Sequence, residues 1–145
     1  MRKKLLLVVF TIFLLTLSAC SGGTGGMVTG SRQSCKSSGG TAFCEGKINK
    51  LSGTVTHEAQ TSNFRDGEAV LVEALFNIES GRLRISITAP DGTVTLREAA
   101  PGAPAELIGI ATVDSSMDDN VTPLTLEALD GDVQGITFSI AVTLP

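Results

Sequence analysis

The sequence contains neither tryptophan nor tyrosine, and only six phenylalanines. Two of these, Phe10 and Phe13, lie in the N-terminal apolar segment, so only four serve the rest of the chain. Sugar-binding faces, base-stacking platforms and interface hot spots rely heavily on tryptophan and tyrosine. Any recognition surface on this protein is therefore expected to consist of small polar, aliphatic and charged side chains.

Basic residues are scarce beyond the first few positions. The chain has 11 Lys and Arg against 15 Asp and Glu, and three of the basic residues precede Cys20. From Cys20 onward, eight basic residues remain against 15 acidic ones, a side-chain balance of −7. Phosphate contacts need cations, so we expect no nucleic-acid partner. The acidity is expected to keep an exported domain soluble.

The sequence also lacks an apolar run long enough to cross a membrane as a helix. Arg2-Lys3-Lys4 is followed by an uncharged apolar run from Leu5 to Leu17, which is thirteen residues. A membrane-spanning helix needs about twenty. A basic start followed by an apolar stretch of this length is typical of a signal peptide. Residues 1–19 are predicted to be one.

The four residues Leu17-Ser18-Ala19-Cys20 resemble the lipobox of bacterial lipoproteins. The resemblance implies that a diacylglycerol unit is attached to the sulfur of Cys20 and that the bond between Ala19 and Cys20 is cleaved. Two acyl chains, at about 0.8 kcal/mol per methylene, supply on the order of 20 kcal/mol of transfer free energy, which makes the anchor durable. An ordinary secretory signal, with Cys20 incidental, is the alternative.

The expected location is the cell envelope, with the protein anchored to the outer face of the cytoplasmic membrane or to the outer membrane. Ser21 follows the modified cysteine, where an Asp often signals retention in the inner membrane. In a host with two membranes, Ser21 therefore favours the outer one. The membrane, reached through the lipid on Cys20, is the one partner that the residues indicate directly. An envelope protein or a surface ligand is a further possible partner.

Residues 20–42 are predicted to form a lipidated N-terminus and a flexible linker. Residues 21–42 contain seven Gly and five Ser and little apolar content, and such a chain spans about 25 Å. The run Gly22–Gly26 lacks the flanking elements and the Gly-Lys-Ser/Thr ending of a phosphate loop, so we expect no cofactor there or elsewhere. Cys35 and Cys44 are expected to form a disulfide in an exported protein, with free thiols as the alternative.

Residues 43–145 are predicted to fold as an all-β domain, an antiparallel β-sandwich of six to eight strands. Apolar and polar residues alternate along most of this segment, and turn signals such as Asp91-Gly92 and Asp130-Gly131 separate the runs. The expected strands are 44–51, 53–60, 68–79, 83–88, 93–97, 106–113, 123–129 and 136–144. The segment from Gly81 to Val94 resembles the middle hairpin of jelly-roll sandwiches in accessory domains of secreted proteases, which supports the same fold.

Two groups of residues are candidates for chemical sites. His57 lies in an expected strand, but no second His or serine elbow accompanies it, so we expect a solvent-facing side chain and no catalytic residues. A calcium site is a second hypothesis, because the hard oxygen ligands of the loop 114–120 suit Ca²⁺ if backbone carbonyls complete the shell. Asp130 and Asp132 would add ligands if their loop shares one end of the sandwich with the first. Its candidate ligands are Asp114, Asp118, Asp119, Asp130 and Asp132. A solvated acidic turn is the simpler interpretation.

The leading functional hypothesis is an anchored, non-enzymatic module that presents a β-sandwich for binding or for a structural role in the envelope. An exported enzyme with a scattered site using His57, and a calcium-stabilised adhesion module, are the alternatives.

The lipid anchor predicts the behaviour of a single-atom substitution. Cys20→Ser keeps the signal peptide but removes the thiol that accepts the lipid. We expect the variant to lose incorporation of labelled palmitate and to differ in mass from the lipidated protein. A variant that stays membrane-bound at unchanged mass would contradict the lipid anchor.

Overall fold

The computed structural model describes residues 25–116 and 119–145. The expected signal peptide, the lipobox with Cys20, and Asp118 lie outside these ranges, so the predictions made for them stay predictions. In the described part of the chain, no helix is long and apolar enough to cross a membrane.

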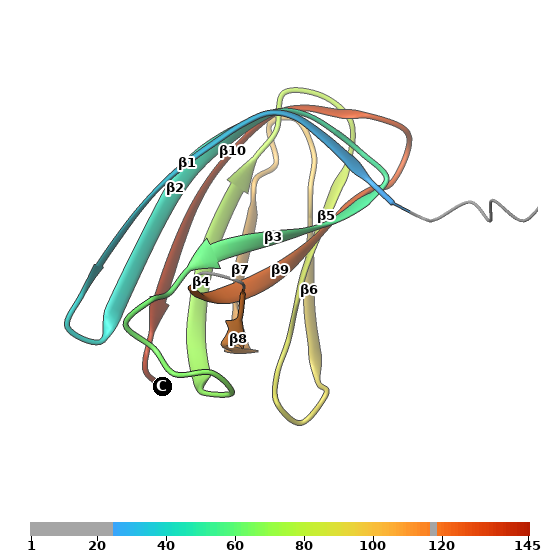
Figure 1. The fold of residues 1–145 in the computed structure, drawn as a ribbon. Helices are drawn as coiled ribbons and strands as arrows, with labels where there is room; N and C mark the ends of the chain where they lie inside the picture. Colours follow the sequence, from blue (N-terminus) through green and yellow to red (C-terminus); the bar gives the residue numbers. More distant parts are fainter. Residues whose placement is uncertain (1–24, 117–118) are drawn as a thin grey trace, which may run out of the picture.

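The described residues form ten strands in two antiparallel sheets (Figure 1). Sheet A has the order β1-β2-β10-β4-β7, and sheet B has the order β3-β9-β5-β6, with β8 paired to β9. The strands are β1 (Met27–Ser38), β2 (Thr41–Ser52), β3 (Thr54–Gln60), β4 (Ala69–Asn77), β5 (Leu83–Thr88), β6 (Val94–Ala99), β7 (Ala105–Thr112), β8 (Asp114–Ser115), β9 (Asn120–Ala128) and β10 (Val133–Thr143).

The fold is a jelly-roll sandwich, as the alternating residues predict. Apart from β1 and the two-residue β8, each of the eight remaining strands corresponds to an expected one. Most consecutive strands lie in opposite sheets, while β5 and β6 form a hairpin within sheet B. Eight strands wound in this way across two sheets are characteristic of jelly rolls. The total of ten strands exceeds the expected six to eight because β1 and β8 carry no apolar alternation.

The expected flexible linker is wrong from residue 27 onward, and the expected domain start at residue 43 is wrong with it. Residues 27–38 form β1, which pairs with β2 along its whole length, from Met27 opposite Ser52 to Ser38 opposite Thr41. The polar composition of this segment did not indicate a strand, because β1 is an edge strand whose side chains are mostly exposed. Backbone pairing, which any side chain permits, orders this segment.

The disulfide between Cys35 and Cys44 is confirmed, and it lies within the β1–β2 hairpin. The two residues face each other in register, with their Cα atoms 4.1 Å apart. The disulfide therefore ties the edge strand to sheet A, in place of joining a loose tether to the first strand.

Sheet A bends where β1, β2 and β10 pass through the row of residues that contains Asn49. Burial recurs after three residues, between Ile48 and Leu51 in β2 and between Val133 and Ile136 in β10. Buried residues in a regular strand are two positions apart. A spacing of three means that the opposite face of the strand points inward beyond this row, so the strands rotate there. Gly30 and Gly135, with φ of 64° and 63°, flank Asn49 at this row. A side chain at Gly30 would collide with Asn49, so only glycine permits the turn there.

The disulfide is expected to stabilise the fold through the unfolded state. Replacing Cys35 and Cys44 together by Ala frees a loop of about ten residues, which is worth about 3 kcal/mol of unfolding free energy. Urea denaturation should show this loss, and hydrogen exchange should show faster exchange in β1 than in β4. Ser34→Ala in the same strand serves as the control. An unchanged midpoint for the double variant would mean that the bond adds no stability.

Candidate functional site

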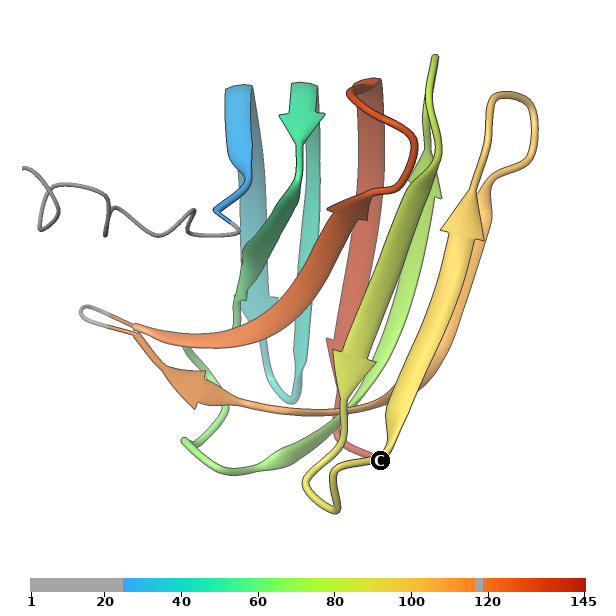
Figure 2. The same ribbon diagram turned by 90° about the vertical axis from the view of Figure 1, so that its right-hand side faces the viewer.

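A groove opens on the outer face of sheet B where β9 separates from β5. The two strands pair from Leu83 opposite Ala128 to Ser86 opposite Thr125, and the ladder stops there. The next β9 residue on that face is Pro123, which has no N–H to donate, so the ladder cannot continue. Figure 2 shows β9 and β5 together at one end and apart toward the other. The resulting groove has a volume of about 580 Å³.

Hydroxyl groups line the floor of the groove. Thr56, Thr125 and Ser86 form one row across β3, β9 and β5, since Thr125 pairs with both of the others. Thr88 and Thr112 add two more hydroxyls, so the groove offers both donors and acceptors of hydrogen bonds. The lining as a whole is Thr56, Asp66, Gly67, Ser86, Ile87, Thr88, Ala89, Pro90, Thr112, Val113, Asp114, Pro123 and Thr125.

Two carboxylates stand on the rim, and none of the described lining residues is a cation. Asp66 lies on the loop between β3 and β4, and Asp114 lies on β8. Without a neighbouring Lys or Arg in the lining, both favour a neutral or positively charged ligand over an anionic one.

Backbone hydrogen bonds hold the rim in place. The N–H of Gly67 donates to the carbonyl of Val113 at 2.8 Å, and the N–H of Val113 donates to the carbonyl of Glu68 at 2.9 Å. The side-chain amide of Asn120 donates to the carbonyl of buried Phe64 at 2.7 Å. The loop before β4 is thus fixed to the segment around β8, and the groove is formed before any ligand binds.

The surface beside the groove is aliphatic. Val94 and Leu96 of β6 pair with Thr88 and Ser86, and their side chains are exposed. Of the four phenylalanines in the domain, Phe43 is exposed, on sheet A, and the other three are buried. The groove therefore offers hydrogen bonds and small aliphatic contacts, without a stacking platform.

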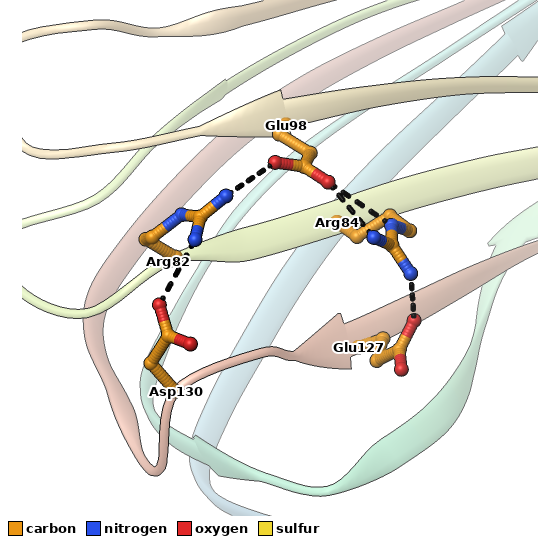
Figure 3. A network of polar contacts seen from close by, with 5 residues as sticks. All are labelled: Arg82, Arg84, Glu98, Glu127 and Asp130. Atoms are coloured by element: carbon orange, nitrogen blue, oxygen red, sulfur yellow. Dashed lines mark hydrogen bonds and ion pairs between the residues drawn. The ribbon is translucent and has the colours of Figure 1, made fainter.

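A network of ion pairs occupies the neighbouring row of the same face (Figure 3). Arg84 lies between Glu98 of β6 and Glu127 of β9 and contacts them at 2.9 and 3.1 Å. Arg82 joins Glu98 to Asp130, at 2.8 and 3.2 Å. Hydrogen bonds from Arg84 and then Arg82 lower the pKa of Glu98. Both guanidinium groups are engaged within the network, next to the groove.

The expectation of a solvent-facing His57 is wrong. In β3, Val55, His57 and Ala59 point toward sheet A, because the outer positions are taken by Thr56 and Glu58. The ring of His57 meets Phe138 edge-on, with centroids 4.6 Å apart, and its Nε2 atom is buried without a hydrogen-bond partner among the described residues. Burial lowers its pKa to about 4. His57 lies on the face of β3 opposite to the groove.

The four aspartates of the calcium hypothesis that the structure describes do not come together. Asp114 and Asp119 lie next to the start of β9, whereas Asp130 and Asp132 follow its end, so the nine residues of β9 separate the two loops. Asp130 contacts Arg82, and Asp132 contacts Lys50 at 2.6 Å. The two loops lie at opposite ends of the sandwich, and the described ranges contain no group of three His, Cys, Asp or Glu suited to a metal ion.

The groove residues were missed by sequence reasoning, because isolated threonines and serines in strands carry no signal of their own. Pro123 was the available signal, since a proline inside a strand pattern marks a place where a ladder ends.

No protein-family model and no curated protein matches the chain. Similar solved structures include peruvianin-I, a cysteine peptidase from Thevetia peruviana latex, with 13% identity over 79% of this chain and 62% of that chain, and a TM-score of 0.39. N-terminal modules of the Clostridium thermocellum endo-1,4-β-D-xylanase 10B, complexed with xylohexaose, show 11% identity over 84% and 26% of the two chains, with a TM-score of 0.42. A family 11 carbohydrate-binding module of a Clostridium thermocellum cellulase shows 11% identity over 83% and 87%, with a TM-score of 0.33.

The chain spans less than two thirds of the length of the first two of these proteins. Similarity at these levels identifies neither a ligand nor an activity. The fold and the groove define the protein as a jelly-roll β-sandwich with a polar surface groove.

The half-buried imidazole of His57 predicts a pH dependence of stability. His57 binds a proton near pH 6.5 in the unfolded chain and near pH 4 in the folded one. Stability is therefore complete above pH 6.5 and falls as the pH drops toward 4, by about 3 kcal/mol at most, because unfolding takes up a proton. His57→Gln should remove this component from urea-unfolding curves measured across that range.

A direct check is available because the chain contains one histidine. Its NMR titration should have a midpoint near pH 4, and a midpoint near 6.5 would show that the ring is solvated. The carboxylates, including Glu98 and Asp132, titrate in both proteins, so they cancel in the comparison of wild type with His57→Gln.

Proposed function

We propose that the protein is a lipid-anchored envelope lipoprotein whose β-sandwich binds a hydroxyl-rich, uncharged or cationic ligand in the groove, without catalysing a reaction. The observation that carries the proposal is the preformed groove, with its hydroxyl floor, two carboxylates and no cation. The lipobox at Leu17–Cys20 supports the anchor.

The position of the groove suits an anchored protein. The chain enters β1 at the end of the sandwich where β2 ends and β10 begins. The groove rim, with Asp66 and Asp114, lies at the other end, where β4 begins and β7 ends (Figure 1). The nine residues of β4, at about 3.3 Å each, put about 30 Å between the two ends. A ligand can thus reach the groove from the side away from the anchor.

The spacer is shorter than the sequence suggested. Gly26 already donates its N–H to the carbonyl of Thr54, so only residues 21–25 separate Cys20 from the domain. Five residues span at most about 18 Å. The domain would therefore stay close to the membrane surface, and its reach would come from the length of the sandwich.

The arrangement of polar groups supports binding over catalysis. The one histidine faces Phe138 inside the sandwich, on the other side of β3 from the groove hydroxyls. Among the described residues, Cys35 and Cys44 are bonded to each other. Among the described residues, the groove hydroxyls thus have neither an imidazole nor a free thiol beside them.

The ligand class can be tested by calorimetry on the full chain in detergent, with a chitosan hexamer as the cationic probe and xylohexaose as the neutral one. We expect the chitosan hexamer to bind about tenfold more tightly, because the groove has carboxylates and no cation. Thr125→Val and Asp114→Asn should each weaken binding several-fold, since each removes one hydrogen-bonding or charged group.

Matched controls lie on sheet A. Thr143→Val and Glu73→Gln make the same chemical changes on the outer face of that sheet, away from the groove, and should leave binding unchanged. Equal effects of the groove and control variants would show that the probe binds by general charge. Failure of both probes to bind would overturn the proposed ligand class.

A further inference from the structure

The strand β1 forms a free edge of sheet A. At twelve residues it is as long as β2, and in the described part of the chain β2 is its only strand partner. An edge strand presents one row of unpaired N–H and C=O groups, which can pair with an added strand.

The register shows which residues present that row. Cys35 and Cys44 are directly opposite, and their short Cα separation of 4.1 Å marks a non-hydrogen-bonded pair. In such a pair, both backbones point their N–H and C=O groups away from each other. Because the pattern alternates, Gln33, Cys35 and Ser37 direct their backbone groups to the free edge, and the residues between them bond to β2.

The edge is held in an extended conformation before any partner arrives. The disulfide joins Cys35 to β2, and the side-chain amide of Gln33 donates to the carbonyl of Glu58 in β3 at 3.1 Å. A strand that is already ordered loses little conformational entropy when a second strand pairs with it.

The charge of this hairpin is opposite to that of the rest of the domain. β1 and β2 carry four basic residues and one acidic residue, whereas residues 53–145 carry four basic and 14 acidic ones. Arg32 and Lys36 lie four residues apart on one face of β1, and both are exposed. Within the described ranges, neither takes part in an ion pair.

We propose that β1 docks an extended peptide strand that carries two acidic side chains four residues apart. Main-chain hydrogen bonds to Gln33, Cys35 and Ser37 would hold the strand, and Arg32 and Lys36 would select its acidic residues. A second copy of the chain is disfavoured in the register centred on Ser34. Two β1 edges paired about Ser34 would place Arg32 opposite Lys36 of the other copy, and like charges in opposite positions are destabilising.

The probe is a nine-residue peptide of alternating Thr and Val in which positions three and seven are Glu. Its binding to the full chain in detergent is measured by fluorescence polarisation. We expect binding to weaken at least tenfold when alternate backbone nitrogens are methylated, because methylation removes the N–H donors. Replacing both Glu by Lys should have a similar effect.

Protein variants separate the contribution of the main-chain hydrogen bonds from that of Arg32 and Lys36. Ser37→Pro removes an N–H that faces the free edge and should weaken binding at least tenfold, while Ser37→Ala keeps the N–H and should bind normally. Arg32→Glu combined with Lys36→Glu should lose the Glu peptide and gain the Lys peptide. Arg97→Glu is the control: it makes the same charge reversal at one position on β6, away from β1. It should leave peptide binding unchanged.

Two results would overturn the inference. If the methylated peptide binds as well as its parent, the edge forms no ladder. If vesicles containing anionic lipid bind in a manner that depends on Arg32 and Lys36 and the peptide does not bind, the cations serve a lipid surface. The charge-reversed variant keeps the test decisive even if Ser37→Pro destabilises the fold, because a swap of peptide preference requires folded protein.

Discussion

The layer of side chains between the two sheets is the constraint on which the rest of the structure depends. Each strand must place its apolar residues in this layer, and the rings at its centre show how closely they fit. Phe76 stacks on Phe138 with centroids 5.7 Å apart, and His57 approaches Phe138 from the other sheet. Gly46 leaves room for the Phe138 ring, because a side chain at this position would collide with it. An imidazole held in this layer stays neutral, because charging it there costs desolvation.

The same constraint explains where the polar surface lies. With one face of sheet B buried, most of its serines, threonines, arginines and glutamates occupy the other face, in rows set by the register. One row became an ion-pair network around Arg84, and the next became the groove floor around Thr125. A single residue separates these outcomes: Pro123 ends the ladder, so β9 leaves β5 and exposes a groove instead of a flat sheet.

The groove and the β1 edge are separate surfaces with opposite electrostatic character. The groove has carboxylates without a cation in its lining, and the β1–β2 hairpin carries most of its charge as Lys and Arg. The groove lies on the outer face of sheet B, while β1 is the edge of sheet A. Both surfaces can therefore be occupied at once.

The pattern of residues determined the class of fold, because burial on one face imposes a period of two that strands such as β4 and β10 display openly. It also indicated the disulfide, since two cysteines so close in an exported chain have few other uses. The strand β1, the inward His57 and the separation of Asp114 from Asp130 depended on tertiary structure. An edge strand needs no apolar pattern, and the direction of a lone polar side chain follows from register. The order in which the strands cross between the two sheets decides which loops meet at one end of the sandwich. No local segment of the sequence encodes that order.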